Sequence, residues 1–359
     1  MAGKLRVDLG ERSYNIYCGK GLLEELGLLL EPLDIAKRCL VVTDETVAPL
    51  YLSRVIQSLE AGGFTPLVKQ VPPGEEAKSL KVASEIYDMA LEAGWERRCP
   101  VLALGGGTVG DLAGFVAATL LRGVPFIQLP TTLLAQVDSS VGGKVAVNHP
   151  RGKNLIGAFY QPCLVVADLS TLRTLPAREL SSGLAEVIKY GMIYDAVFFT
   201  YLEEHVEKAL EQKEEVLEKI VLRSCEIKAQ IVAKDEREKD LRAILNFGHT
   251  VGHALEAVTK FQVYRHGEAV AIGMMMATRM ALQRGLISSE ILKRLEKLLR
   301  RASLPVEMPE VDIGSFLEAL IRDKKVRDGK VRMVLPVKLG RVEIMEVDTR
   351  EVIEALQRS

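Results

Sequence analysis

The sequence predicts an α/β protein: an N-terminal, Rossmann-like doubly wound domain followed by a mostly α-helical C-terminal domain. In the first half, short apolar runs alternate with helical patterns, and a glycine-rich turn follows one of those runs. In the second half, long helical periodicity dominates. Strands that alternate with helices are typical of a parallel sheet covered on both faces. The pattern changes near residue 176, so we expect one domain at 1–176 and the other at 177–359.

The first half contains five apolar runs that we interpret as buried strands, because each is too short for a helix. They cover residues 38–43, 66–71, 100–104, 125–129 and 164–167. Between several of these runs, apolar residues recur at helical spacing. The helices expected there cover residues 47–61, 80–93 and 111–121.

Beyond residue 176, apolar residues recur every three or four positions over long stretches, which predicts amphipathic helices. The expected helices cover residues 178–190, 197–233, 248–259, 268–284, 288–301 and 313–322. Two further runs, at 331–335 and 341–346, are expected to be strands. The charged stretch at 203–219 keeps helical apolar spacing, so we interpret it as a solvated helix face rather than a tail.

Length and composition restrict the classes of partner. A chain of 359 residues exceeds what one hydrophobic core usually supports, which agrees with two domains. The net charge of -1, with 26% charged and 48% hydrophobic residues, gives no support for a nucleic-acid or membrane partner. Five cysteines without a C-x-x-C pair fit reduced packing thiols, and the first residues lack the apolar core of a signal peptide. We therefore expect a cytoplasmic protein.

The segment GGGTVGD at 105–111 follows an expected strand and opens an expected helix. Glycines there allow the backbone to approach a pyrophosphate, and the helix N-terminus supplies amide donors. The acidic residue usual about 20 positions later is missing. Asp44 instead ends the first expected strand, where its carboxylate can meet a ribose hydroxyl. The alternative is a glycine-rich turn without a ligand, but the combination favours a dinucleotide site.

Two lysines of the next segment indicate anionic partners. Lys144 is framed by glycines and apolar residues, and Lys153 precedes Asn154 at the start of another apolar run. The first of these is not a Walker A lysine, because the required glycine and the following Ser or Thr are missing. Such lysines favour phosphate or carboxylate groups as ligands.

Three of the five histidines, His249, His253 and His266, fall within eighteen positions. Neutral imidazole is a common zinc ligand, and a catalytic site usually takes three protein ligands. Glu186 and Lys189 lie three apart in a helical pattern with apolar flanks, which indicates a cleft rather than the usual surface ion pair. Glu186 therefore offers an oxygen ligand beside two histidines. The spacing leaves His253 and His266 as alternatives for the second histidine.

Four long segments, at 105–123, 130–162, 178–191 and 242–256, closely resemble the 3-dehydroquinate synthase family of sugar phosphate cyclases. The resemblance covers nearly the whole chain. It implies a cytoplasmic homodimer of the shikimate pathway with NAD and a divalent metal, zinc or cobalt, the second domain binding the metal. It also implies a carbon-oxygen lyase that converts 3-deoxy-D-arabino-heptulosonate 7-phosphate, a phosphorylated sugar acid, to 3-dehydroquinate and phosphate. The steps implied are transient oxidation by NAD, phosphate elimination, re-reduction, ring opening and intramolecular aldol closure.

The resemblance also carries over individual residues. The metal ligands it implies are Glu186, His249 and His266, which moves His253 to substrate binding or proton transfer. Catalytic or substrate contacts are implied for Arg122 (from a neighbouring subunit), Asp138, Lys144, Asn154, Lys189, Lys228, Arg242, Asn246, His253 and Lys325, with Lys324 as the alternative to the last. NAD contacts are implied for Asp44, Gly74, Glu75, Lys78, Gly107, Thr108, Val109, Gly110, Asp111, Thr131, Thr132, Lys144, Lys153, Thr171, Leu172, Arg173 and Thr174. Thr108 replaces a residue that is hydrophobic in many relatives.

Three other functions compete with this interpretation. One is another sugar phosphate cyclase, such as a 2-deoxy-scyllo-inosose or 2-epi-5-epi-valiolone synthase. The others are a metal-dependent polyol dehydrogenase and a non-catalytic NAD-binding protein. The dehydroquinate substrate alone among the cyclase substrates carries a carboxylate, so Lys228, Arg242 and Asn246 together favour it. The complete ligand set argues against a non-catalytic protein.

Overall fold

The computed structural model describes residues 3–238, 240–323 and 330–357, and the chain divides into two compact units. The first unit runs to Leu175 and includes Leu217–Ala233, while the second comprises Pro176–Val216 and the residues from Lys234 onward. The sequence predicts a single boundary near residue 176, whereas in the structure Leu217–Ala233 packs with the first unit. The assignment of the cofactor to one domain and the metal to the other stays a prediction.

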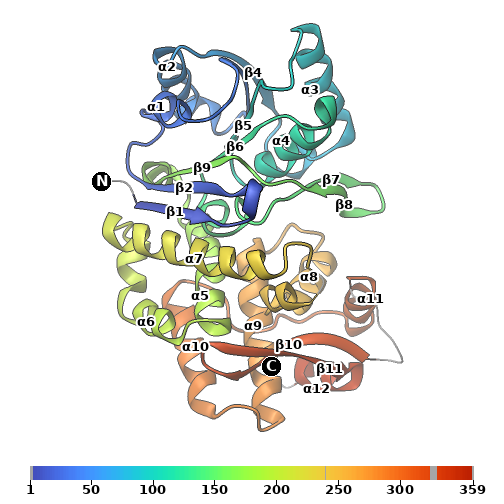
Figure 1. The fold of residues 1–359 in the computed structure, drawn as a ribbon. Coiled ribbons are helices and arrows are strands. Elements are labelled where there is room, and N and C mark those ends of the chain that lie inside the picture. Colours follow the sequence, from blue (N-terminus) through green and yellow to red (C-terminus); the bar gives the residue numbers. More distant parts are fainter. Residues whose placement is uncertain (1–2, 239, 324–329, 358–359) are drawn as a thin grey trace. The chain divides into compact units, whose positions relative to one another are not determined.

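The first unit is built on a seven-stranded sheet in the order β1-β2-β9-β6-β5-β3-β4 (Figure 1). The strands are β1 (Gly3–Val7), β2 (Tyr14–Gly19), β3 (Arg38–Asp44), β4 (Thr65–Val71), β5 (Val101–Gly105), β6 (Phe126–Pro130) and β9 (Leu164–Asp168). Only β1 and β2 pair antiparallel within this sheet. The five predicted strands and the parallel, Rossmann-like arrangement are thus confirmed.

Two hairpins of the first unit were not predicted. They are β1–β2 at the sheet edge and the separate pair β7 (Lys144–His149) and β8 (Gly152–Phe159). β1 alternates partly buried and exposed residues up to its buried last residue, Val7, and every residue of β8 is exposed or only partly buried. β1 and β8 therefore lack the continuous apolar run by which a buried parallel strand is recognised.

Helices cover both faces of the large sheet, because successive strand residues point to opposite sides. Val42 of β3 joins one apolar cluster with residues of α3 (Leu80–Glu92) and α4 (Gly107–Thr119). Its neighbour Val41 joins the other cluster with residues of α1 (Leu26–Leu30) and α2 (Ser53–Ala61). Figure 1 shows α1 and α2, in blue, and α3 and α4, in cyan, on opposite sides of β5 and β6.

The structure corrects two predicted helices. α4 begins at Gly107 rather than at residue 111, because Gly106 is its extended N-cap and the glycine-rich segment forms the first helical turn. The helix predicted at 197–233 is two helices, α6 (Ala196–Leu210) and α7 (Glu214–Lys234). Gln212 adopts a left-handed backbone (φ 57°), and the amides of residues 212 and 213 bond back to the end of α6. This turn ends the helix although the apolar spacing continues through it.

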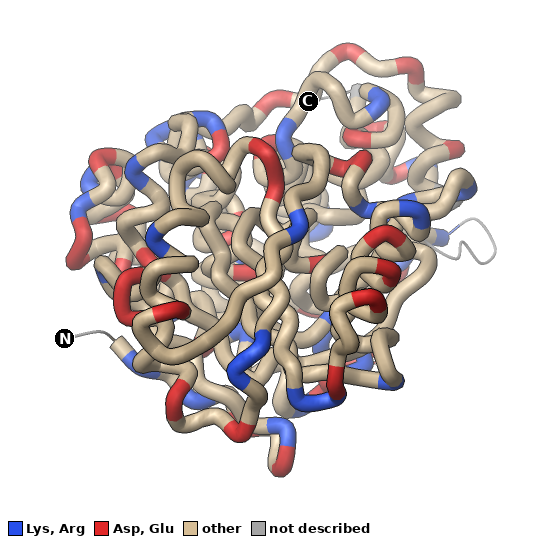
Figure 2. Tube along the Cα trace, turned by 90° about the horizontal axis from the view of Figure 1, so that it is seen from above, with Lys and Arg blue, Asp and Glu red and all other residues tan. Residues whose placement is uncertain are grey.

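The second unit is mostly helical, as predicted. Besides α6, it contains α5 (Ala177–Ile193), α8 (His249–Val258), α9 (His266–Gln283), α10 (Ser289–Arg301), α11 (Ile313–Asp323), α12 (Thr349–Gln357) and the antiparallel pair β10 (Lys330–Lys338) and β11 (Arg341–Asp348). α9 is buried along most of its length and packs against α5, α8, α10, α12 and β10. Within the described residues, no helix is long and apolar enough to cross a membrane. Basic and acidic positions are interspersed along the chain (Figure 2).

Candidate functional site

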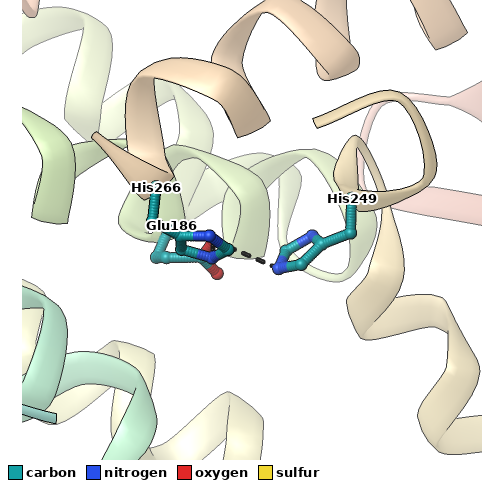
Figure 3. Close-up of side chains that lie close together, drawn as sticks. All are labelled: Glu186, His249 and His266. Atoms are coloured by element: carbon teal, nitrogen blue, oxygen red, sulfur yellow. Dashed lines mark ion pairs between the residues drawn. The ribbon is translucent and has the colours of Figure 1, made fainter. Parts of the chain in front are cut away.

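Three helices of the second unit bring Glu186, His249 and His266 together (Figure 3). Glu186 lies inside α5, and the two histidines are the first residues of α8 and α9. Nε2 of His249 lies 3.5 Å from Oε1 of Glu186, and Nε2 of His266 lies 3.8 Å from the same oxygen. A tetrahedral ion bound at about 2.1 Å from each ligand atom separates those atoms by about 3.4 Å. The spacing therefore fits a small divalent ion.

The hydrogen bond of the outer ring nitrogen fixes the tautomer of His249. Its Nδ1 lies 3.1 Å from the carbonyl oxygen of Phe247, and a carbonyl can only accept, so Nδ1 carries the proton. Nε2 then presents its lone pair toward Glu186. Burial, followed by the charge of Lys189 and the two neighbouring imidazoles, holds the pKa of His249 well below its usual range. The ring is thus neutral at neutral pH, as a metal ligand requires.

Glu186 is a buried carboxylate that Lys189 balances in charge but that accepts no hydrogen bond from the described residues. Its side chain is fully buried, and neither carboxylate oxygen accepts a hydrogen bond in the described part of the chain. An ion pair with buried Lys189 partly balances the charge. Burying a carboxylate without hydrogen bonds is costly, and a divalent ion with two imidazole ligands would remove that cost. The residues present therefore fit a zinc or cobalt ion.

Two glycines allow the helices to meet at this place. A Cβ on Gly267 would lie 1.9 Å from the carbonyl oxygen of Ser182 in α5, so only glycine lets the start of α9 come this close. The amide of Gly267 also donates to Oγ of Ser182 at 3.0 Å. Gly248 caps α8 with a left-handed backbone (φ 80°), which directs His249 into the cluster. The ligand geometry thus depends on backbone contacts between helices.

The ring of His253 lies beside those of His249 and His266, but His253 does not belong to the group of ligand atoms that contains Glu186. Its ring centroid is 5.4 Å from that of His249 and 6.0 Å from that of His266. A second group of ligand atoms combines His253, Glu256 and His266, in which Glu256 faces the other ring nitrogen of His266. The geometry therefore places His266, rather than His253, with Glu186 and His249.

Further polar residues of the second unit come from the short 3₁₀ segment η7 (Leu241–Asn246). Arg242 is buried and donates from Nη1 to the carbonyl of Glu236, while its backbone amide donates to Asp235. Asn246 donates from Nδ2 to Oε1 of Glu238 at 2.9 Å. Both predicted substrate residues are thus held by the loop that follows α7. Lys325 and its alternative, Lys324, lie outside the described residues.

The predicted NAD residues of the first unit follow the carboxyl ends of four neighbouring parallel strands. Asp44 ends β3, the glycine-rich turn follows β5, Thr131 and Thr132 follow β6, and residues 171–174 follow β9. The carboxyl edge of a parallel sheet is where dinucleotides bind in doubly wound folds. The amide of Thr131 donates to the carbonyl of Gly105, which ties two of these segments together. Oδ1 of Asp44 accepts from the amides of residues 46 and 47, so its carboxylate is oriented by the following turn.

Lys78 is buried and contacts the last residue of the glycine-rich segment, Asp111. Its Nζ donates to Oδ2 of Asp111 and to Oδ1 of Asn154, each at 2.6 Å. Burial raises the pKa of Asp111, and the neighbouring Lys78 charge opposes that effect. The predicted contact residues Gly74 and Glu75 belong to the preceding 3₁₀ turn η3 (Gly74–Ala77), where Gly74 has a left-handed backbone (φ 78°).

The predicted substrate residues of the first unit include a partly buried ion pair. Lys228 of α7 donates to the carbonyl and to Oδ1 of Asp138, both at 2.8 Å. Lys144 and Lys153 are exposed on the β7–β8 hairpin. Arg122 is also exposed. Leu121 and Arg122 both have a left-handed backbone, with φ of 50° and 68° respectively.

Comparisons with known proteins show to which family the chain is similar. Residues 68–182 match the family described as 3-dehydroquinate synthase N-terminal, and residues 183–326 match that described as 3-dehydroquinate synthase C-terminal. The chain is 52% identical over 350 residues to a 3-dehydroquinate synthase of Desulforamulus reducens, an alignment that covers 97% of each sequence. The chain belongs to the 3-dehydroquinate synthase family. The predicted family resemblance is confirmed.

Two solved structures place this 3-dehydroquinate synthase family member among the sugar phosphate cyclases. A 2-deoxy-scyllo-inosose synthase complexed with carbaglucose-6-phosphate, NAD⁺ and Co²⁺ is 26% identical, with a TM-score of 0.92 over 99% of this chain and 100% of that one. ValA, the 2-epi-5-epi-valiolone synthase of Streptomyces hygroscopicus subsp. jinggangensis 5008 with NAD⁺ and Zn²⁺ bound, is 31% identical, with a TM-score of 0.89 over 98% of each chain. The fold is therefore that of the cyclases.

Three residues in contact with the expected family sites were missed in the sequence. Glu256 follows His249 by seven positions and His253 by three, so it shares a face of α8 with both histidines. This helical spacing is a signal by which Glu256 could have been found in the sequence. Glu238 and Asn148 lie in a loop and at a strand end, where no periodicity relates them to their partners. Only the structure places Glu238 on Asn246, and Asn148 on Asn154.

Proposed function

We propose that this chain is a 3-dehydroquinate synthase that converts 3-deoxy-D-arabino-heptulosonate 7-phosphate to 3-dehydroquinate and phosphate. In this reaction a secondary alcohol is oxidised transiently, phosphate is eliminated, the ketone is reduced again, and the opened ring closes by an aldol step. NAD is regenerated in each turnover, so the enzyme is a carbon-oxygen lyase rather than an oxidoreductase. The observation that carries the proposal is the 52% identity, over 97% of both sequences, to a 3-dehydroquinate synthase.

The proposal needs NAD and a divalent metal. When bound, these supply a hydride acceptor and a Lewis acid that favours ionised substrate hydroxyls. Glu186 and the Nε2 atoms of His249 and His266 would hold the ion, and Lys189 forms an ion pair with Glu186. Both cofactors occur in the related cyclase structures, with Co²⁺ in one and Zn²⁺ in the other. The carboxyl edge of the parallel sheet, with Asp44 and the glycine-rich turn, would hold NAD.

The protein's cations and amides would bind the substrate anions. Lys228 and Arg242 are buried cations, and Asn246 is held by Glu238, so their positions are largely set before a ligand binds. Buried cations suit a substrate with both a phosphate and a carboxylate. We assign proton transfer to His253, whose ring lies beside those of His249 and His266. These assignments favour a carboxylate-bearing substrate over the sugar phosphates without a carboxylate that other cyclases use.

Purified protein with a catalytic amount of NAD, one divalent metal and heptulosonate phosphate tests the proposal. We expect phosphate release and formation of the carbocycle in equal amounts, without accumulation of NADH. Accumulating NADH would favour a polyol dehydrogenase. Turnover of glucose 6-phosphate, with none of heptulosonate phosphate, would favour another sugar phosphate cyclase. Parallel assays of metal-free protein reloaded with zinc or with cobalt compare the two ions.

We also propose a cytoplasmic homodimer in which Arg122 of one subunit reaches the substrate of its partner. The side chain of Arg122 is exposed, and the backbone of Leu121 and Arg122 is left-handed. The exposure supports a contact with the partner subunit. Light scattering after size-exclusion chromatography measures the oligomeric state. Mixing an Arg122→Ala protein with an inactive Lys189→Ala protein tests the exchange of residues, because mixed dimers would recover one intact site each.

A further inference from the structure

Asn148, the penultimate residue of β7, is half-buried and joins two segments of the first unit. Its backbone amide donates to the carbonyl oxygen of Lys78 at 2.7 Å. Its Nδ2 donates to Oε2 of Glu75 at 2.7 Å, and its Oδ1 accepts from the backbone amide of Asn154 at 3.1 Å. A single side chain thus uses both ends of its amide group, one toward the η3 turn and the other toward β8.

These bonds form a closed ring through Lys78. Asn148 bonds the backbone of Lys78 and of Asn154, and Nζ of Lys78 donates to Oδ1 of Asn154. An ammonium group can only donate, so Oδ1 of Asn154 must face Lys78, and Nδ2 of Asn154 must point away from it. Asn154 therefore offers a donor to a ligand. Its left-handed backbone (φ 57°) costs energy, which the bond to Asn148 helps to offset.

We propose that Asn148 is a positioning residue that couples the cofactor-binding turn to the substrate-binding amide. It orders Glu75 and Lys78 on one side, and on the other it orients Asn154 so that Nδ2 donates to an oxygen of the phosphorylated substrate. The identity of the two ligands rests on the proposed function. The ring of hydrogen bonds does not depend on it.

Two substitutions of Asn148 distinguish the contribution of its side-chain Nδ2 from that of its Oδ1. Asn148→Asp keeps the oxygen that accepts from the Asn154 amide, but it replaces the donor with an oxygen that faces the Glu75 carboxylate. Asn148→Ala removes both bonds. Asn15→Asp is the matched control, because Asn15 is a half-buried residue of β2 that pairs with β1 and β9 and has no predicted ligand role.

The measurements are the Kd of NAD without substrate, the KM and kcat for heptulosonate phosphate, and hydrogen exchange of the peptide that contains Asn154. We expect the Kd of NAD to rise about fivefold or more in both Asn148 variants, because both lose the bond to Glu75. The KM should rise by a similar factor, and the amide of Asn154 should exchange faster, in Asn148→Ala alone. Asn15→Asp should match the wild type in all three.

Equal KM values in wild type and Asn148→Ala, or unchanged exchange at Asn154, would overturn the inference. So would equal effects of the Asp and Ala variants on KM and exchange, since these indicate general disorder of the hairpin. If the wild-type chain fails to convert heptulosonate phosphate, the proposed function fails instead. The NAD affinity and the exchange rates then still decide the role of Asn148.

Discussion

Oε1 of Glu256 lies 3.4 Å from Nδ1 of His266, on the side of the imidazole ring opposite the nitrogen that faces Glu186. Glu256 is nearly buried, and it projects from the same helix as His249. A carboxylate at the outer nitrogen of a histidine keeps the proton there. This directs the lone pair of Nε2 to the metal and increases its basicity.

Glu256→Gln should therefore weaken metal binding without removing a ligand. We expect about a 10- to 100-fold loss of affinity, because changes at such outer partners of ligating histidines have effects of that size. Competition with a chromophoric chelator measures the affinity for zinc and cobalt. Glu290→Gln, an exposed residue at the start of α10, is the control and should leave the affinity unchanged. An unchanged affinity in Glu256→Gln would show that this carboxylate does not orient the ring.

The sequence predicted the central strands and the ligand candidates better than the contacts between them. Apolar runs identify β3, β5 and β6 because those strands are buried on both faces. The histidines are recognised by crowding, but their spacing does not decide whether His253 or His266 joins His249 as a ligand. His266 joins the cluster only because Gly267 lets α9 pack against α5, and sequence spacing does not report such a tertiary contact. The 3₁₀ and hairpin contacts of Asn148 and Glu238 escape prediction for the same reason.

Substitutions of Glu186, His266 and His253 distinguish the metal ligands from a neighbouring histidine that does not bind the metal. Glu186→Gln and His266→Ala should each remove the metal and the activity together, because each leaves only two protein ligands. His253→Ala should retain one equivalent of metal and lose most of the activity, since its ring lies outside the Glu186 group. Metal analysis of the three purified variants decides the assignment. A metal-free His253→Ala protein would mean that His253, rather than His266, is the third ligand.

Gly267→Ala should disturb the site through the backbone. The added Cβ would meet the carbonyl oxygen of Ser182 at 1.9 Å, so the start of α9 has to move away from α5. We expect the free energy of unfolding of the metal-free protein to fall by about 1–3 kcal/mol, as for other overpacked cores, with weaker metal binding. Denaturant unfolding measures the first and chelator competition the second. Gly314→Ala is the control, because the nearest atom to its added Cβ is a side-chain oxygen at 3.5 Å. Equal stability of both variants would contradict the close contact.

The buried cysteines give the stability a dependence on alkaline pH. All five cysteines are free, and burial raises the pKa of Cys39 and of Cys225 to about 12. In the unfolded chain a thiol ionises near pH 8.5, so above that pH the unfolded state loses protons that the folded state retains. The stabilisation from each neutral thiol is therefore complete below about pH 8.5 and declines as the pH rises toward 12. Between pH 8 and pH 10 we expect a loss of about 2 kcal/mol per thiol. Denaturant unfolding of wild type and Cys39→Ala at both pH values measures this loss, and the variant should lose about 2 kcal/mol less than the wild type. An identical pH dependence in the two proteins would mean that the Cys39 thiol ionises as readily in the folded as in the unfolded chain.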